Sequence, residues 1–248
     1  MKNNEISLIR KASLIAADTL NYLEDKIKVG ITTDELNKLA HDYIIKNNGI
    51  PAFLNYRKFP KSICVSINEE VVHGIPSERK LEIGDIVSID VGVCYEGYYG
   101  DTAKTFAVGK IDDQKQFLLK HTKIALEKGI AVVKAGTKTG DIGYAIASYL
   151  KEYNLGIVEV LVGHGIGKKL HQKPDIPNYG QKGKGYMLKA GMVIAIEPMI
   201  NAGTKEVVMK QDGWTIVTAD NSPSAHFEHT VLVLENGFEI LTKRWLNG

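Results

Sequence analysis

Apolar and polar positions alternate most regularly between residues 84 and 106, which read GDIVSIDVGVCYEGYYGDTAKTF. Alternation of this kind predicts two β-strands, each with one apolar face, joined by a short turn at 95–97. Reflection through that turn places Asp101 opposite or diagonal to Asp90, and such cross-strand neighbours lie roughly 5 to 8 Å apart. The pattern leaves two interpretations open. The aspartates either lie on a solvated sheet face or hold a cation between them, because two adjacent carboxylates otherwise repel each other.

Helical periodicity predicts four helices, two before the alternating stretch and two after it. Thr32 and Glu35 have the spacing of a capping box, so the second helix is expected to begin there. The chain after residue 192 is rich in strand and turn patterns. No linker or low-complexity segment interrupts the chain. The predicted helices cover residues 5–27, 32–47, 113–134 and 139–153.

Three short motifs recur in the same order in the two halves of the chain. One of them, L-x2-G-x4-I followed by an acid, ends on Asp90 in the first half and on Glu197 in the second. Such a repeat predicts a pseudo-twofold α+β domain whose two acid-bearing strands converge on the axis. Glu197 is therefore expected beside Asp90 in space. The other two motifs pair Lys28-Val29-Gly30 with Lys134-Ala135-Gly136, and Val72-His73-Gly74-Ile75 with Gly163-His164-Gly165-Ile166.

Two further acids, Glu197 in AIEPM and Glu228 in HFEHT, are predicted to lie in the middle of strands. With Asp90, Asp101 and His164 they make a set of four carboxylates and one imidazole. Each unpaired buried charge costs several kcal/mol, so four converging carboxylates need compensation, and two divalent cations would supply it. Oxygen donors with one imidazole suit Mn, Fe, Co or Zn. The residues alone thus favour a dinuclear metallohydrolase.

Composition is compatible with that hypothesis and excludes several other classes. The 248 residues are 44% hydrophobic and 24% charged, with a formal net charge of +2, which is ordinary for a globular protein and does not indicate a nucleic-acid or membrane surface. Cys64 and Cys94 form no CxxC pair, so a disulfide framework or zinc knuckle is not expected. We find no signal peptide and no apolar run of membrane-spanning length. A cytoplasmic location is the expectation.

A series of motifs extends over nearly the whole chain: NEEVVHGIP, GDIVSIDVGV, GYYGDTAKTF, GHGIG, IEPM and FEHT. Together they resemble the type I methionine aminopeptidases of the bacterial class, which belong to metallopeptidase family M24. The resemblance implies the pita-bread fold of that family, an α+β architecture with a curved, mainly antiparallel sheet and helices on its outer face. It also implies a single catalytic domain at 1–248, made of two pseudo-symmetric halves at about 1–110 and 111–248.

The resemblance implies a methionyl aminopeptidase that removes the initiator methionine of nascent polypeptides when the second residue is small. Hydrolysis would use a metal-bridging water and two divalent ions per chain, which could be Co, Mn, Fe or Zn. Asp90 should bind one ion, Asp101 and Glu228 should bridge both, and His164 with Glu197 should complete the other site. A monomer that meets its substrate near the ribosome is the further expectation.

The resemblance also assigns catalytic roles. Glu197 is expected to shuttle the proton of the attacking water. His171 is expected to hold the scissile carbonyl and to stabilise the developing oxyanion. His73 should contact the leaving-group side of the peptide.

The pocket for the methionine side chain departs from the family pattern at three positions. Phe53 stands where many bacterial relatives have cysteine, Phe59 where tyrosine is common, and Leu170 where phenylalanine is common. Each keeps an apolar wall that suits a thioether. His226, where relatives often carry glutamine, is hypothesised to neighbour the cleft, whereas His41 and His121 are expected at the surface. The family pattern is matched by Tyr56, Cys64 and Trp214.

Prolidase and aminopeptidase P share this fold and metal set but carry a large extra N-terminal domain, which is not expected here. The 30 residues between Glu197 and Glu228 are too few for the helical insertion of type II methionine aminopeptidases. A zinc-binding N-terminal extension, as in the eukaryotic type I form, is likewise not expected. A metal-free binding protein of the same fold would have lost a ligand, and none of the five is lost. The sequence therefore favours an enzyme.

Overall fold

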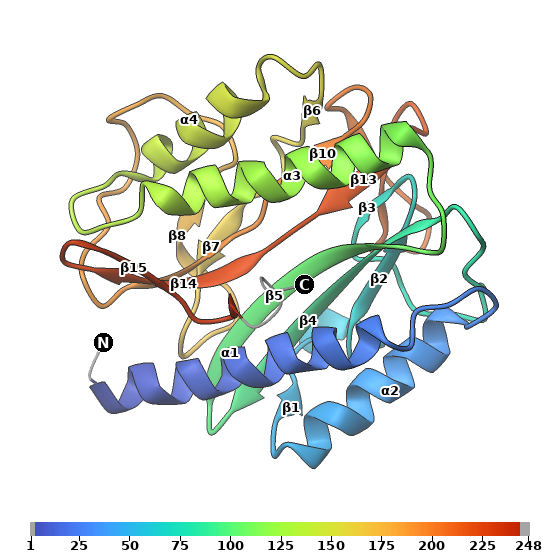
Figure 1. Cartoon of the computed structure of the whole chain (residues 1–248). Coiled ribbons are helices and arrows are strands. Elements are labelled where there is room, and N and C mark those ends of the chain that lie inside the picture. The colour runs from blue at the N-terminus through green and yellow to red at the C-terminus, as the bar shows by residue number, and fades with distance from the viewer. Residues whose placement is uncertain (1–2, 244–248) are drawn as a thin grey trace.

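Four α-helices and a series of short antiparallel strands make up the part of the chain that the computed structural model describes, residues 3–243 (Figure 1). Each predicted helix is present, and three of the four end three residues earlier than the periodicity indicates. The capping box at Thr32 and Glu35 is present in both directions, with the Glu35 amide 3.1 Å from Thr32 Oγ1 and the Thr32 amide 2.7 Å from the Glu35 carboxylate. The helices are α1 (Asn3–Glu24), α2 (Thr33–Lys46), α3 (Asp113–Ala131) and α4 (Thr139–Leu150), with a 3-10 turn, η1, at Tyr56–Lys58.

The strands form four sheets, and every strand pair within them is antiparallel. One sheet has the order β1-β4-β2, with β5 also paired to β4. The others run β13-β10-β6, β11-β12-β3 and β15-β14-β9-β7-β8. The bounds are β1 (Ile50–Pro51), β2 (Cys64–Ile67), β3 (Glu70–Val72), β4 (Ile86–Tyr95), β5 (Tyr98–Ala107), β6 (Gly156–Ile157), β7 (Gly163–Gly165), β8 (Gln172–Ile176), β9 (Val193–Ile196), β10 (Met199–Asn201), β11 (Val207–Met209), β12 (Ile216–Thr218), β13 (Ser224–His226), β14 (His229–Leu234) and β15 (Gly237–Ile240).

The helices lie on two sides of the strands. Figure 1 shows α1 and α2 along one side and α3 and α4 along the other, with the sheets between them. The main core fills the space between helices and strands, where Leu20 of α1, Ile89 of β4, Leu118 of α3 and Ile194 of β9 are all fully or almost fully buried. Burial of these apolar side chains stabilises the fold, and the mixture of helices with antiparallel sheets confirms the predicted α+β class.

The β4–β5 hairpin has the geometry that the alternating pattern predicts. Gly92 pairs with Asp101 and Asp90 pairs with Ala103, so the two aspartates are diagonal neighbours on one face. Glu96 and Gly97 form the two-residue turn, with φ of 48° and 80°. A tight hairpin turn of this length requires positive φ at both positions, which glycine adopts without strain.

Strand β5 also contacts β14, which brings the two halves of the chain together. The amide of Asp101 donates to Thr230 Oγ1 at 3.0 Å, and the Thr230 hydroxyl donates back to the Asp101 carbonyl at 2.7 Å. Thr102 Oγ1 donates to the Glu228 carbonyl at 2.7 Å, and the Glu228 amide donates to the Ala103 carbonyl at 2.9 Å. These bonds place Glu228 next to the hairpin, although more than 120 residues separate them in the chain.

The expectation for His121 is wrong. This side chain is only 7% exposed, and its Nδ1 lies 2.8 Å from the hydroxyl of Tyr149. The rings of Phe117 and Tyr153 lie 4.1 and 4.0 Å from the imidazole, measured between centroids. The sequence of α3 alone predicts that this face of the helix is polar and exposed. In the structure, α4 and the residues after it pack against that face and cover it. None of the described helices is both long and apolar enough to cross a membrane.

Candidate metal centre

Five side chains converge where the hairpin meets the strands of the second half. Asp90 lies on β4, Asp101 on β5 and His164 on β7, while Glu197 directly follows β9 and Glu228 directly precedes β14. Their donor atoms form overlapping groups whose members all lie within 4.8 Å of one another. Asp101, His164 and Glu228 each belong to two groups, and of the carboxylates only Asp101 and Glu228 are shared in this way. The groups are Asp90, Asp101 and Glu228; His164, Glu197 and Glu228; and Asp101, His164 and His171.

Glu197 and Glu228 lie at strand interruptions, which corrects the prediction that they occupy the middle of strands. Strand β9 ends before Glu197, and the pairing resumes at Met199, opposite His226. The register is the same on both sides of the gap, since Ile196 pairs with His229 before it. The two carboxylates therefore face each other across the interruption, where the backbone leaves its regular pleat and both side chains can turn toward the hairpin.

Burial perturbs the ionisation of the four acids strongly. It raises the pKa of Asp90 to about 7. Burial, reinforced by the negative charges of the neighbouring carboxylates, raises the pKa of Asp101, Glu197 and Glu228 well above the ordinary range. No lysine or arginine of the described residues forms an ion pair with any of the four. Without a cation, burial therefore favours the protonated, neutral forms of these acids, and their ionised forms need positive charge that no lysine or arginine of the described residues supplies.

His164 is poised as a neutral nitrogen donor. Burial lowers its pKa to about 4, and its Nδ1 lies 3.0 Å from the Gly165 carbonyl. A carbonyl only accepts, so Nδ1 carries the proton and Nε2 has a free lone pair. This Nε2 lies 3.5 Å from Glu197 Oε1 and 4.0 Å from Asp101 Oδ2.

The donor set fits divalent cations. Asp90 Oδ1 and Glu228 Oε1 are buried and have no hydrogen-bond partner, which is costly unless another group satisfies them. Oxygen donors with one imidazole are typical ligands of first-row divalent ions. Bound cations would satisfy these oxygens and neutralise the carboxylates in the same step.

The cluster opens into a cleft of about 300 Å³ with an apolar wall on one side. Five of the six residues predicted for the methionine pocket line this cleft, whereas Leu170 does not. Leu170 is 2% exposed and packs in the apolar cluster behind Phe53 and Phe59. The lining residues from the prediction are Phe53, Tyr56, Phe59, Cys64 and Trp214.

His171 lies next to the cluster of four carboxylates and His164, with its ring centroid 4.3 Å from that of His164. Its Nδ1 lies 2.9 Å from the hydroxyl of Tyr56, which comes from η1 far away in the chain. Burial, and next the proximity of His164, lowers the pKa of His171. The imidazole is therefore neutral and held by Tyr56 with Nε2 free for the cleft.

His73 reaches the same cleft from the loop after β3. Its backbone has a φ of 59°, a left-handed conformation that is uncommon for a residue with a side chain and is found at functional sites. Gly74, the next residue, allows the backbone to pass close to β2, because a Cβ at this position would lie 2.2 Å from the Val65 carbonyl oxygen. Burial lowers the pKa of His73.

His226 does neighbour the centre, as hypothesised. It is 2% exposed, and its Nε2 lies 3.8 Å from Glu197 Oε2 without a hydrogen-bond partner. His41 is half-buried, and its Nδ1 lies 2.8 Å from Ser62 Oγ. Four residues that line the cleft were not among the predicted site residues: Arg57, Val162, Gly163 and Asp175. Arg57 is adjacent to Tyr56, and Val162 and Gly163 come directly before His164, so these three had neighbours that could have pointed to them.

Comparison with known proteins supports one family. The pattern of metallopeptidase family M24 matches residues 7–235. A methionine aminopeptidase of Rickettsia prowazekii is 50% identical over 235 residues, which are 94% of this chain and 91% of that protein. The crystal structure of methionine aminopeptidase from Rickettsia prowazekii superposes with a TM-score of 0.96 at 48% identity and covers 98% of both chains. A prolidase of Pyrococcus furiosus is more distant, with a TM-score of 0.79 and 25% identity over 98% of this chain but 64% of its own.

Proposed function

We propose that this chain, which belongs to metallopeptidase family M24, removes the N-terminal methionine of peptides by metal-dependent hydrolysis. The observation that carries this function is the cluster of four carboxylates and one imidazole at the floor of an apolar cleft. Of the M24 activities, methionine removal is supported by 50% identity to a methionine aminopeptidase over nearly the full length of both chains.

Two divalent ions are proposed as cofactors, with Co, Mn, Fe and Zn as candidates. Asp90 would bind one ion, Asp101 and Glu228 would bridge both, and His164 with Glu197 would complete the second site. This assignment follows the family resemblance, and the overlapping donor groups support it, because Asp101 and Glu228 are the two carboxylates that belong to two groups each. Bound there, the ions would polarise the scissile carbonyl and acidify a water molecule.

The remaining chemistry belongs to the side chains around the cluster. Glu197 has a 15% exposed side chain compared with 4% for Asp101, so it borders both the cluster and the cleft. Its carboxylate takes the proton of the attacking water and delivers it to the nitrogen of the leaving peptide. His171, with Nδ1 accepting from Tyr56, donates from Nε2–H to the carbonyl oxygen as negative charge develops. His73 holds the leaving-group side.

The methionine side chain would lie against the apolar wall of the cleft. Phe59 and Trp214 pack edge to face with centroids 5.1 Å apart, and Phe53 is 7% exposed. Such a wall contacts a flexible thioether along its whole length. Leu170 would act from behind by supporting the phenylalanines.

In the cell, the substrates would be nascent polypeptides whose second residue is small, met near the ribosome in the cytoplasm. We propose that the two halves, at about 1–110 and 111–248, form one catalytic unit. The bonds between β5 and β14 support this, because they complete the donor set from both halves. We propose that this unit acts as a monomer.

The test measures hydrolysis of a Met-Gly peptide by the purified protein, first after all metal has been removed and then after metal is added back. Activity should return on addition of Mn, Fe(II), Co or Zn at controlled free concentration, and metal analysis should find two ions per chain. A proline dipeptide of the prolidase type is the matched control and should not be cleaved. A protein that binds no metal and cleaves no Met-Gly peptide would contradict the proposal.

Substitution of Tyr56 by Phe should lower kcat about five- to tenfold and leave KM nearly unchanged. The change removes the hydroxyl that contacts His171 Nδ1 at 2.9 Å but keeps the ring in the pocket, and one such hydrogen bond contributes about 1 kcal/mol. Steady-state kinetics with Met-Gly peptides measures this. Phe59→Tyr, which adds a hydroxyl nearby, is the control, and an unchanged kcat in Tyr56→Phe would refute the role of the hydroxyl.

A further inference from the structure

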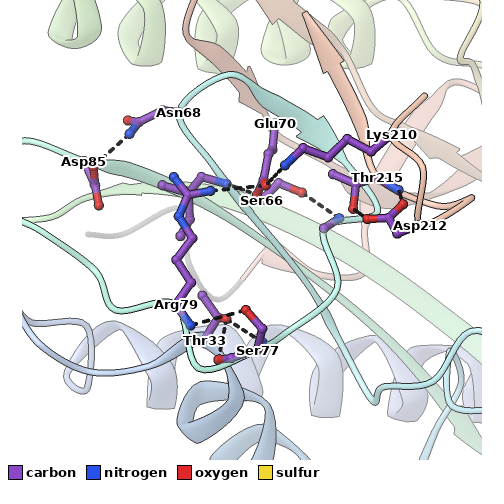
Figure 2. Close-up of polar contacts among 12 residues, drawn as sticks. Thr33, Ser66, Asn68, Glu70, Ser77, Arg79, Asp85, Lys210, Asp212 and Thr215 are labelled. Atoms are coloured by element: carbon purple, nitrogen blue, oxygen red, sulfur yellow. Dashed lines mark hydrogen bonds and ion pairs between the residues drawn. The ribbon is translucent and has the colours of Figure 1, made fainter. Parts of the chain in front are cut away.

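The buried carboxylate of Glu70 joins three chain segments, and Figure 2 shows its contacts with Arg79 and Lys210. Glu70 lies on β3 and is only 8% exposed. Its Oε2 accepts from the amide of Ile67 at 2.9 Å, which closes the turn between β2 and β3. Its Oε1 accepts from Lys210 Nζ at 2.7 Å and from Arg79 Nη1 at 3.2 Å. No role in metal binding or catalysis explains this residue.

The loop that carries Trp214, residues 210–215, is closed on itself. The Lys210 amide donates to the Thr215 carbonyl at 2.8 Å. Asp212 Oδ1 accepts from the amides of Trp214 and Thr215, both at 2.8 Å, and Asp212 Oδ2 accepts from Thr215 Oγ1 at 2.6 Å. Because these bonds make the loop one unit, the contact of Lys210 with Glu70 joins the Trp214 loop to β3, in addition to the pairing of β12 with β3 at Ile216 and Val217.

Glu70 also lies three residues before His73, which lines the cleft together with Trp214. The rings of His73 and Trp214 lie edge to face with centroids 6.3 Å apart, and both line the cleft. Thr215 Oγ1 lies 3.5 Å from the His73 carbonyl oxygen, so the Trp214 loop also contacts the His73 backbone directly. Glu70 thus connects the segment that carries His73 with the loop that carries Trp214.

We propose that Glu70 is a positioning residue that sets the width of the cleft next to His73 and Trp214, and thereby the preference for a small residue after the N-terminal methionine. The inference rests on the proposed function. If His73 and Trp214 are held rigidly, they exclude a branched second residue of the peptide by steric contact. If they can move apart, the branched residue fits. The Glu70–Lys210 bond is charge-assisted, and such bonds are about twice as strong as neutral ones.

The experiment compares kcat/KM for a Met-Gly and a Met-Val peptide in Glu70→Gln, Lys210→Met and the double variant. Each single substitution should reduce the preference for Met-Gly about five- to tenfold, chiefly through faster cleavage of Met-Val. The double variant should show no further loss beyond that of Glu70→Gln, because both changes break the Glu70–Lys210 contact and only Glu70→Gln also weakens the contact with Arg79. Lys210 is 42% exposed at its side chain, so its replacement leaves the core intact. Equal losses for both peptides would overturn the proposal.

A second readout is independent of substrate. The chain has two tryptophans, so a Trp245→Phe background leaves Trp214 as the only one. Acrylamide should quench its fluorescence faster in Glu70→Gln and Lys210→Met. Glu159→Gln, which removes the exposed Glu159–Lys205 ion pair, is the control and should change nothing. Unchanged quenching would overturn the positioning role, whereas a wild-type chain that cleaves neither peptide would overturn the proposed function and with it the specificity role.

Discussion

Asp90→Asn should abolish turnover and at the same time make the metal-free protein more stable. Activity should fall more than about 100-fold, since the substitution removes a carboxylate ligand of one ion, and loss even of groups that only support metal ligands costs 10- to 100-fold. Metal analysis should show one ion bound more weakly than in the wild type.

The gain in stability has a separate cause. Burial raises the pKa of Asp90 to about 7, so above that pH the metal-free protein holds an ionised carboxylate that favours unfolding. An amide of the same shape removes this charge from a cluster of four acids. We expect the free energy of unfolding at pH 8 to rise by about 1–3 kcal/mol, within the limit that a shift of this size allows.

Thermal unfolding with excess chelator at pH 8 measures this, and a rise of roughly 2 °C or more is expected for a chain of this length. Asp42→Asn, at an exposed position of α2, is the matched control and should change neither activity nor melting temperature. An active Asp90→Asn enzyme with both ions bound would refute the assignment of Asp90 as a ligand.

Removal of the metal should reverse the pH dependence of stability. The four acids have folded-state pKa values above their unfolded values near 4. Their contribution to the stability of the metal-free protein is therefore fully present below pH 4. It is lost as the pH rises through about 7 for Asp90 and through higher values for the others.

Divalent ions bind the ionised carboxylates of the folded state, so the stabilisation that they add grows over the same pH range. At an ion concentration 100 times the dissociation constant it amounts to about 2.7 kcal/mol. Melting temperatures with Mn²⁺ and with chelator should therefore diverge from pH 5 to pH 8. In Asp90→Asn the divergence should be smaller, and curves that stay parallel in the wild-type protein would exclude a metal site built from these acids.

The β4–β5 hairpin shows how far local pattern extends. Alternation along 84–106 and a short turn were sufficient to place Asp90 and Asp101 as opposite or diagonal neighbours, because the pleat is set by residues close in the chain, and the observed register makes them diagonal. The capping box at Thr32 and Glu35 was predicted for the same reason. The repeat extended the prediction to Glu197, since two copies of one supersecondary unit place equivalent residues at equivalent positions.

The pattern of apolar and polar residues predicted strand regularity and exposure less well where segments that are far apart in the chain pack together. Alternation assigned Glu197 and Glu228 to regular strands, but both strands are interrupted there. The interruption follows from the packing of β13 and β14 against the hairpin, which local pattern does not record. His121 was expected at the surface for a similar reason, because two of the rings that bury it, those of Tyr149 and Tyr153, come from α4 and the residues after it.

The sequence by itself determined the α+β class and the hairpin with its two aspartates, and it predicted the five candidate donor residues that the structure brings together. Only the tertiary structure decided which donor atoms lie within reach of one another, that Leu170 is absent from the lining of the cleft, and that the Tyr56 hydroxyl contacts His171. It also revealed Glu70 as the link between the two segments that carry His73 and Trp214. Residue types and short-range spacing specify the donors, whereas their distances and burial depend on contacts such as that of Thr230 with Asp101, 129 positions apart.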